Sequence, residues 1–153
     1  MQVWTSPAPL VLPIAFATTS RVELIFEELR RDNGSFTAYV FLNPQPLPPD
    51  AGRDHPSFAG AFTIFAPSDC WGGAGHCDWK LPPVSPYDRR PPHHLTPIDR
   101  ALDITRAIRR LDDPAELTVT VHARRAAEPD ATEGVLRFAR LTANAYQTDG
   151  VPA

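Results

Sequence analysis

The stretch RVELIFEELRRDNGSFTAYVFL, residues 21–42, consists of two runs of alternating side chains separated by a turn sequence. The apolar positions are Val22, Leu24 and Phe26 in the first run, and Phe36, Ala38, Val40 and Leu42 in the second. A repeat of two residues predicts two β-strands, over roughly 20–29 and 36–42. The Asn33-Gly34 pair between them is typical of a tight turn. The sequence therefore predicts that these two strands form a hairpin.

Segments on both sides of this hairpin predict further strands. They are a run near 10–16, FAGAFTIF at 58–65, a short strand ending at 102–104, a run at 117–122 and a last run at 135–146. Gly60 in FAGAFTIF allows a close backbone approach or a bulge. Thr105 is a candidate N-cap for a helix of about two turns, on which Ile108 and Leu111 share one face. About seven strands and one short helix predict an all-β fold, an antiparallel two-sheet β-sandwich.

The bulk composition predicts one globular domain, residues 1–153. The chain is 42% hydrophobic and 22% charged, with a net charge of −3. Lys80 is the only lysine, and the arginines are interspersed with acids, so we expect no nucleic-acid partner. No window is long and apolar enough to predict a membrane span. The first residues lack a basic region and are interrupted by Pro9 and Pro13, which predicts a cytoplasmic location, with co-export beside a partner left open.

The segment 66–97 breaks the alternation and forms a long insertion rich in Cys, His, Trp and Pro. It contains DCWGGAGHCDW at 69–79 and PPHHL at 91–95. Long segments without regular structure in compact domains are usually functional or disordered, and this composition favours function. The candidate metal ligands in it are Cys70, His76, Cys77, His93 and His94.

The spacing of the two cysteines leaves several states open. Cys70 and Cys77 are separated by six residues, a spacing that permits a disulfide, a soft Cu(I) site with His76 nearby, or two inert thiols. The spacing does not match a standard closed zinc site. A blue-copper centre is excluded because the only methionine is Met1 and neither cysteine is followed by the required histidine spacing.

We identify no catalytic residues. The chain has neither a G-x-S-x-G nucleophile motif nor a glycine-rich phosphate loop. His122 shares a strand face with Thr118 and Thr120, which predicts a surface histidine or one with satisfied hydrogen bonds. His55 is predicted to lie in the turn that leads into FAGAFTIF.

The order of the segments resembles a known domain. RVELIFEEL with TAYVFLN, HPSFAGAFTIF, LDITRAIRRL, ELTVTVHA and VLRFARLTA follow one another over residues 20–145. This series is similar to the C-terminal β-sandwich domain of tyrosinases and plant polyphenol oxidases, the type-3 copper enzymes. In that family, six histidines hold two coppers in a separate helical domain. No H-x-x-x-H pair lies on a predicted helix here, so we expect no copper pair of that kind in this chain.

The resemblance implies an accessory role. The chain would be a non-catalytic subunit that binds the catalytic subunit of a type-3 copper oxidase, stabilises or shields it and helps to load copper. The insertion 66–97, which is short in the plant enzymes, would offer Trp71, Trp79 and Leu95 as interface anchors and bind Cu(I) transiently. The alternative is a stand-alone small enzyme or ligand-binding sandwich with a site walled by 66–97. A homodimer through exposed sheet edges is also left open.

Overall fold

The computed structural model describes residues 1–12, 21–31, 34–44, 46–65, 87, 97–111, 116–125 and 134–146. Within these ranges there are nine strands and one helix. In chain order they are β1 (Gln2–Thr5), β2 (Leu10–Val11), β3 (Arg21–Leu29), β4 (Phe36–Leu42), β5 (Phe58–Ile64), β6 (Ile98–Asp103), α1 (Thr105–Ile108), β7 (Glu116–Leu117), β8 (Val119–Arg125) and β9 (Arg140–Tyr146).

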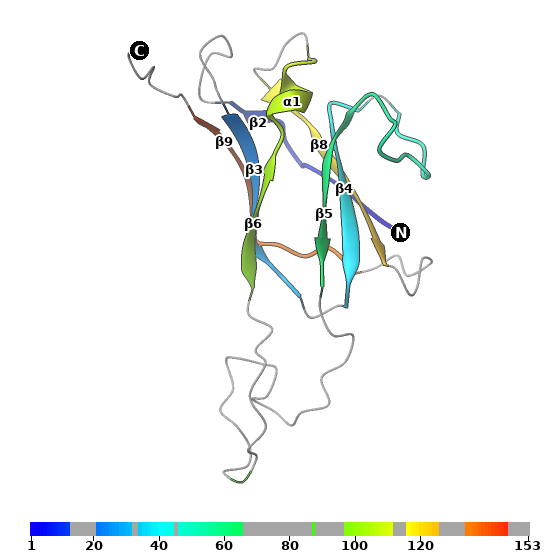
Figure 1. Ribbon diagram of the computed structural model, residues 1–153, viewed down its shortest axis with the longest axis vertical. Coiled ribbons are helices and arrows are strands. Elements are labelled where there is room, and N and C mark those ends of the chain that lie inside the picture. Colours follow the sequence, from blue (N-terminus) through cyan, green and yellow to red (C-terminus); the bar gives the residue numbers. More distant parts are fainter. Residues whose placement is uncertain are drawn as a thin grey trace, which may run out of the picture.

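The strands form two layers. A four-stranded sheet has the order β1-β8-β4-β5, a three-stranded sheet has the order β6-β3-β9, and β2 pairs with β7 in a small third sheet. Every pairing is antiparallel. Figure 1 shows the two larger sheets facing each other, with α1 at one end. The predicted all-β, two-sheet sandwich is confirmed.

The core lies between the facing sheets and is built by alternation. On β3, Val22, Leu24 and Phe26 have no exposed surface, and on β4 the side chains of Ala38 and Val40 are equally enclosed. Alternate residues of β5 and β8 complete the cluster. Burying a side chain such as Phe or Leu stabilises the fold by about 1.5–3 kcal/mol, so these alternating positions hold the two sheets together.

The predicted hairpin of β3 and β4 is wrong. β3 pairs with β6 and β9, whereas β4 pairs with β5 and β8, so the two strands belong to opposite sheets. Gly34, two residues before β4, has a φ of 78°, a conformation that glycine adopts without strain. The chain crosses from one layer to the other because the apolar faces of both strands are buried in the same core.

The predicted role of Gly60 is confirmed. A Cβ atom at this position would lie 3.0 Å from Cδ1 of Leu102 on β6, so the glycine lets the edges of the two sheets approach. The register between β4 and β5 also shifts next to it, because Val40 pairs with Gly60 and Phe41 pairs with Phe58. The position therefore combines a close approach with a bulge.

The helix differs from its prediction at its start. α1 is only four residues long, its N-cap position is Ile104, and no side chain caps it. Thr105 is the first helical residue, and its hydroxyl instead accepts a hydrogen bond from the backbone N–H of Val22 and donates one to Asp103. The hydroxyl therefore attaches the helix to β3. Ile108 is fully buried and Leu111 packs against the core, as their spacing predicted.

The two ends of the chain differ in extent from their predicted strands. The last strand begins at Arg140, because residues 134–139 approach β3 without forming a ladder. The predicted run near 10–16 contains the short β2, and residues 13–20 lie outside the described ranges. No helix in the described part of the chain is long and apolar enough to span a membrane.

Candidate functional site

The segment that follows β4 folds back over the outer face of the four-stranded sheet. We call residues 43–57 the proline loop, since Pro44, Pro46, Pro48, Pro49 and Pro56 lie in it. In Figure 1 it projects from one end of β4 and β5, on the side away from the three-stranded sheet. The loop brings a second layer of side chains onto strands whose other face forms the core.

Asn43 fixes the start of the proline loop. Its φ of 43° is left-handed, a conformation that asparagine tolerates better than most residues. Its N–H donates to the carbonyl of Thr118 at 2.8 Å, and its Oδ1 accepts from the Thr118 N–H at 2.6 Å. This pair of bonds continues the β4–β8 ladder by one residue while the backbone turns away from the sheet.

Arg124 fixes the middle of the proline loop. Its guanidinium donates to the carbonyls of Pro49 and Ala51, at 3.2 and 2.8 Å. The same group lies 5.1 Å from the ring centroid of Tyr39, so it is held over an aromatic face. Prolines have no N–H to offer neighbouring carbonyls, and the arginine supplies the missing donors.

An aromatic cluster lies beneath the loop. Phe41 has no exposed surface, although it points away from the main core. Its ring centroid is 5.2 Å from that of His122, 5.8 Å from that of His55 and 6.0 Å from that of Phe58. His55 accepts a hydrogen bond at Nδ1 from the Ser57 N–H, which confirms its predicted place in the turn before β5.

His122 contradicts its sequence prediction. It is 2% exposed, and its Nδ1 has no hydrogen-bond partner among the described residues. Burial lowers the pKa of the imidazole below 6.5, and the charges of Arg124 and His55 lower it further. The side chain is therefore neutral at pH 7 and has one unpaired nitrogen.

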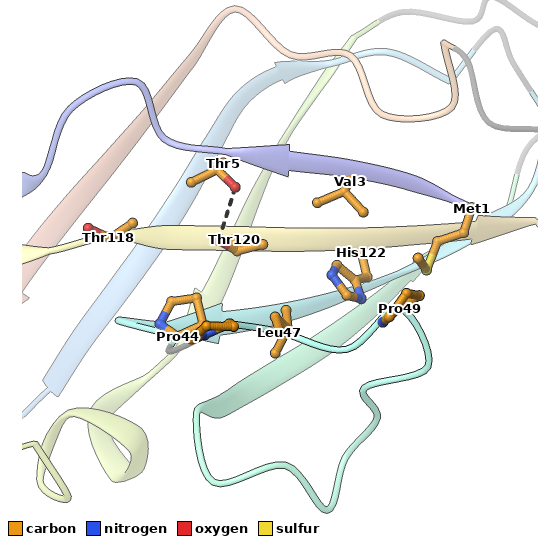
Figure 2. A pocket seen from close by; sticks show the side chains of 10 residues that line it. Met1, Val3, Thr5, Pro44, Leu47, Pro49, Thr118, Thr120 and His122 are labelled. Atoms are coloured by element: carbon orange, nitrogen blue, oxygen red, sulfur yellow. Dashed lines mark hydrogen bonds between the residues drawn. The ribbon is translucent and has the colours of Figure 1, made fainter.

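A cleft of about 400 Å³ lies between the proline loop and the sheet beside His122. It is lined by Met1, Val3, Thr5, Pro44, Pro46, Leu47, Pro49, Thr118, Thr120 and His122. Figure 2 shows His122 between β1 and the loop, with Val3 on one side and Leu47 and Pro49 on the other. The Thr5 and Thr120 hydroxyls, 3.1 Å apart, are hydrogen-bonded to each other (Figure 2). The walls are otherwise mostly apolar.

A second cleft, of about 390 Å³, lies at the side of the sandwich where β1 and β9 form the sheet edges. Trp4 and Phe138 meet edge to face in its wall, with ring centroids 4.9 Å apart. The polar side chains that line it are Ser6 and Arg140. Ser6 accepts from the Val119 N–H and Arg140 pairs with Glu27, so both are already engaged.

The site residues predicted from the sequence lie outside the described ranges. This applies to the proposed metal ligands Cys70, His76, Cys77, His93 and His94, and to the proposed anchors Trp71, Trp79 and Leu95. Among the residues that the structure does describe, no group of three or more His, Cys, Asp or Glu side chains is arranged to hold a metal ion.

Comparison with known proteins supports the fold. No protein-family model and no curated protein matches this sequence. By structure, the chain is similar to a recombinantly expressed latent aurone synthase, a polyphenol oxidase. The TM-score is 0.57 at 13% identity, and the match covers 95% of this chain and 24% of that chain. A latent aurone synthase from a natural source gives 0.55 at 13% identity, over 95% of this chain and 25% of that one.

The likeness is one of architecture. At this identity it shows the fold alone, and it supports the sandwich that the sequence resemblance implied. This chain spans about a quarter of the length of the oxidases that it matches.

The cleft at His122 was not predicted from the sequence. Alternation correctly places His122 on the face shared by Thr118 and Thr120, and a polar face of this kind is usually solvated. The two signals present were the proline cluster at 44–56 and the outward Tyr39 and Phe41, which are apolar for an exposed sheet face. Together they indicate that a loop covers this face.

Proposed function

We propose that this chain is a non-catalytic accessory subunit of a type-3 copper oxidase. It would bind the catalytic subunit, stabilise or shield it, and help to load copper. The supporting observation is that 95% of the chain matches about a quarter of a polyphenol oxidase, while the rest of that oxidase has no counterpart in these 153 residues. A sandwich of this kind beside a catalytic domain is what the sequence resemblance implies.

The insertion 66–97 is the proposed contact. In the sequence it lies between β5 and β6, and Figure 1 shows that β5 ends and β6 begins at the end of the sandwich opposite α1. Trp71, Trp79 and Leu95 would anchor the partner, since buried aromatic side chains carry much of the binding energy in interfaces. Cys70, His76, Cys77, His93 and His94 would supply soft and imidazole ligands for transient Cu(I).

Co-purification tests the partner role. The chain is co-expressed with the catalytic subunit of a type-3 copper oxidase from the same organism, and the complex is isolated through a tag on that subunit. We expect a complex that Trp71→Ser/Trp79→Ser weakens at least tenfold. Tyr146→Ser, on edge strand β9, is the control and retains binding. Absence of a complex, together with oxidase activity that ignores this chain, would overturn the proposal.

A Cu(I) titration tests the copper role separately. The reduced protein is titrated against a chromogenic Cu(I) chelator, and the Cys70→Ala/Cys77→Ala variant is titrated in parallel. We expect stoichiometric binding that the double variant loses and that His55→Asn, in the proline loop, retains. Equal competition by the wild type and the double variant would remove copper loading and leave the partner role standing.

A further inference from the structure

We propose that the cleft beneath the proline loop binds a small neutral molecule with an apolar body and one hydroxyl group, and that this hydroxyl hydrogen-bonds to Nδ1 of His122. This role is independent of the accessory function and of the insertion 66–97. Every residue that carries it belongs to the described part of the sandwich.

The unpaired nitrogen indicates a missing ligand group. Buried polar atoms in native proteins nearly always have a hydrogen-bond partner, so a buried atom without one requires an explanation. Nδ1 of His122 has none among the described residues, while Nδ1 of the neighbouring His55 does. The nearest polar pair in the cleft, Thr5 and Thr120, is already internally bonded. His122 thus carries the buried polar atom of the cleft lining that has no hydrogen-bond partner among the described residues.

The neutral imidazole of His122 favours a hydroxyl group as its hydrogen-bond partner. The imidazole is neutral at pH 7 because burial and nearby positive charge oppose its protonation. A neutral imidazole carries its proton on either nitrogen, so Nδ1 is an acceptor in one tautomer and a donor in the other. A hydroxyl group both donates and accepts, and therefore matches either tautomer. A carbonyl would match only one of them.

The residues that line the cleft favour a ligand that is uncharged and mostly apolar. No Asp, Glu, Lys or Arg side chain belongs to the described lining, and six of its ten residues are apolar: Met1, Val3, Pro44, Pro46, Leu47 and Pro49. Arg124 is nearby, but its guanidinium donates through Nη2 to the carbonyls of Pro49 and Ala51. A charged ligand would lose hydration here and would find no charged side chain among the described lining residues. A volume of about 400 Å³ lies at the small end of the range found for small-molecule sites.

The proline loop must open slightly to admit the hydroxyl, because Nδ1 of His122 is enclosed. Asn43 fixes the loop at its start, and Arg124 fixes it at residues 49–51. The part of the loop between these two attachments contains Pro44, Pro46 and Pro48. Proline has no N–H, so lifting this segment breaks few backbone hydrogen bonds. The segment is suited to act as a lid over His122.

The test compares benzyl alcohol with toluene on the full-length chain. The two probes share a ring and differ in the hydroxyl group. Binding is followed at pH 7 by NMR, from the side-chain ¹⁵N signals of His122 and the amide signals of Val3, Leu47 and Thr120. We expect saturable shifts with both probes, about fivefold tighter binding of benzyl alcohol, and a change of the Nδ1 resonance with the alcohol alone.

Two variants locate the effect. His122→Phe keeps a ring against Phe41 but removes the nitrogen, so we expect both probes to bind equally. His55 also contacts Phe41 but does not line the cleft. His55→Asn should therefore preserve the tighter binding of benzyl alcohol. Equal affinity of the two probes for the wild type, or no shift at His122, would overturn the proposal. If His122→Phe does not fold, the comparison on the wild type still decides.

Discussion

His122 makes the stability of the protein depend on pH. In the unfolded chain this histidine binds a proton near pH 6.5, whereas burial lowers its pKa in the folded state. Below pH 6.5 the unfolded state therefore holds more protons, and the free energy of unfolding falls as the pH is lowered toward the folded-state pKa. Glu27 and Asp103 also have lowered pKa values, but their contributions are lost only below 4.5 and 3.8.

We therefore expect the urea concentration at the unfolding midpoint to decrease as the pH is lowered from about 7 to about 5. His122→Phe should remove most of this pH dependence. His55→Asn should keep most of the pH dependence, because burial is the largest cause of the lowered pKa of His122 and the charge of His55 is the smallest. The measurement is a series of urea titrations at fixed ionic strength. An unchanged slope in His122→Phe would show that another group is responsible.

The fold requires a residue without a side chain at position 60. A side chain there would meet Leu102 at 3.0 Å, at the edge where β5 passes β6. We expect Gly60→Val to lower the free energy of unfolding by about 1–3 kcal/mol through overpacking, measured by urea denaturation. At Gly52 the nearest atom to an added Cβ is the Asp50 carbonyl oxygen, 3.9 Å away. The free energy of unfolding of Gly52→Val should therefore stay within about 0.5 kcal/mol of the wild type. Equal destabilisation by the two substitutions would contradict overpacking against Leu102 as the cause.

At the scale of elements, the side chain of Arg124 fixes the middle of the proline loop. Arg124→Met removes the donors to Pro49 and Ala51 while keeping an unbranched stem over Tyr39. We expect a loss of about 1–2 kcal/mol, and at least tenfold faster amide exchange at Ala51, whose N–H donates to the Pro48 carbonyl. Arg140→Met, which breaks the exposed pair with Glu27 on the other sheet, is the control. Unchanged exchange at Ala51 would mean that the loop is held by packing alone.

The strands also show which features local patterns can predict. Alternation identified β3, β4 and β8 with their core faces, and β5 as a strand, because a period of two depends only on neighbouring residues. It did not identify the partners of β3, because Asn33-Gly34 suits any sharp reversal, and only burial of both apolar faces in one core decides between a hairpin and a crossing. The burial of His122 was equally hidden, since it depends on contacts between Arg124 and residues 49–51, far apart in the sequence.

At the scale of the whole molecule, each sheet is assembled from distant segments. β1 pairs with β8, and β3 lies between β6 and β9. The side chain of Gln2 accepts from the Leu136 N–H at 2.7 Å, which joins β1 to the segment preceding β9. Trp4 and Phe138 then meet between the two sheets, and Phe138 also contacts Phe26 of the core at 5.2 Å. These three rings connect the layers where β1 and β9 leave the sandwich open.

A double-mutant cycle measures this connection. With Trp4→Leu, Phe138→Leu and the double variant, we expect a coupling energy of about 0.5–1.5 kcal/mol between the two rings. Tyr39→Leu combined with Phe138→Leu is the matched control, because Tyr39 lies on the outer face under the proline loop, and this pair should be additive within about 0.5 kcal/mol. Additivity of Trp4 and Phe138 would mean that each ring is buried by its own sheet. Coupling would mean that contact between the rings of Trp4 and Phe138 helps to close the open side of the sandwich.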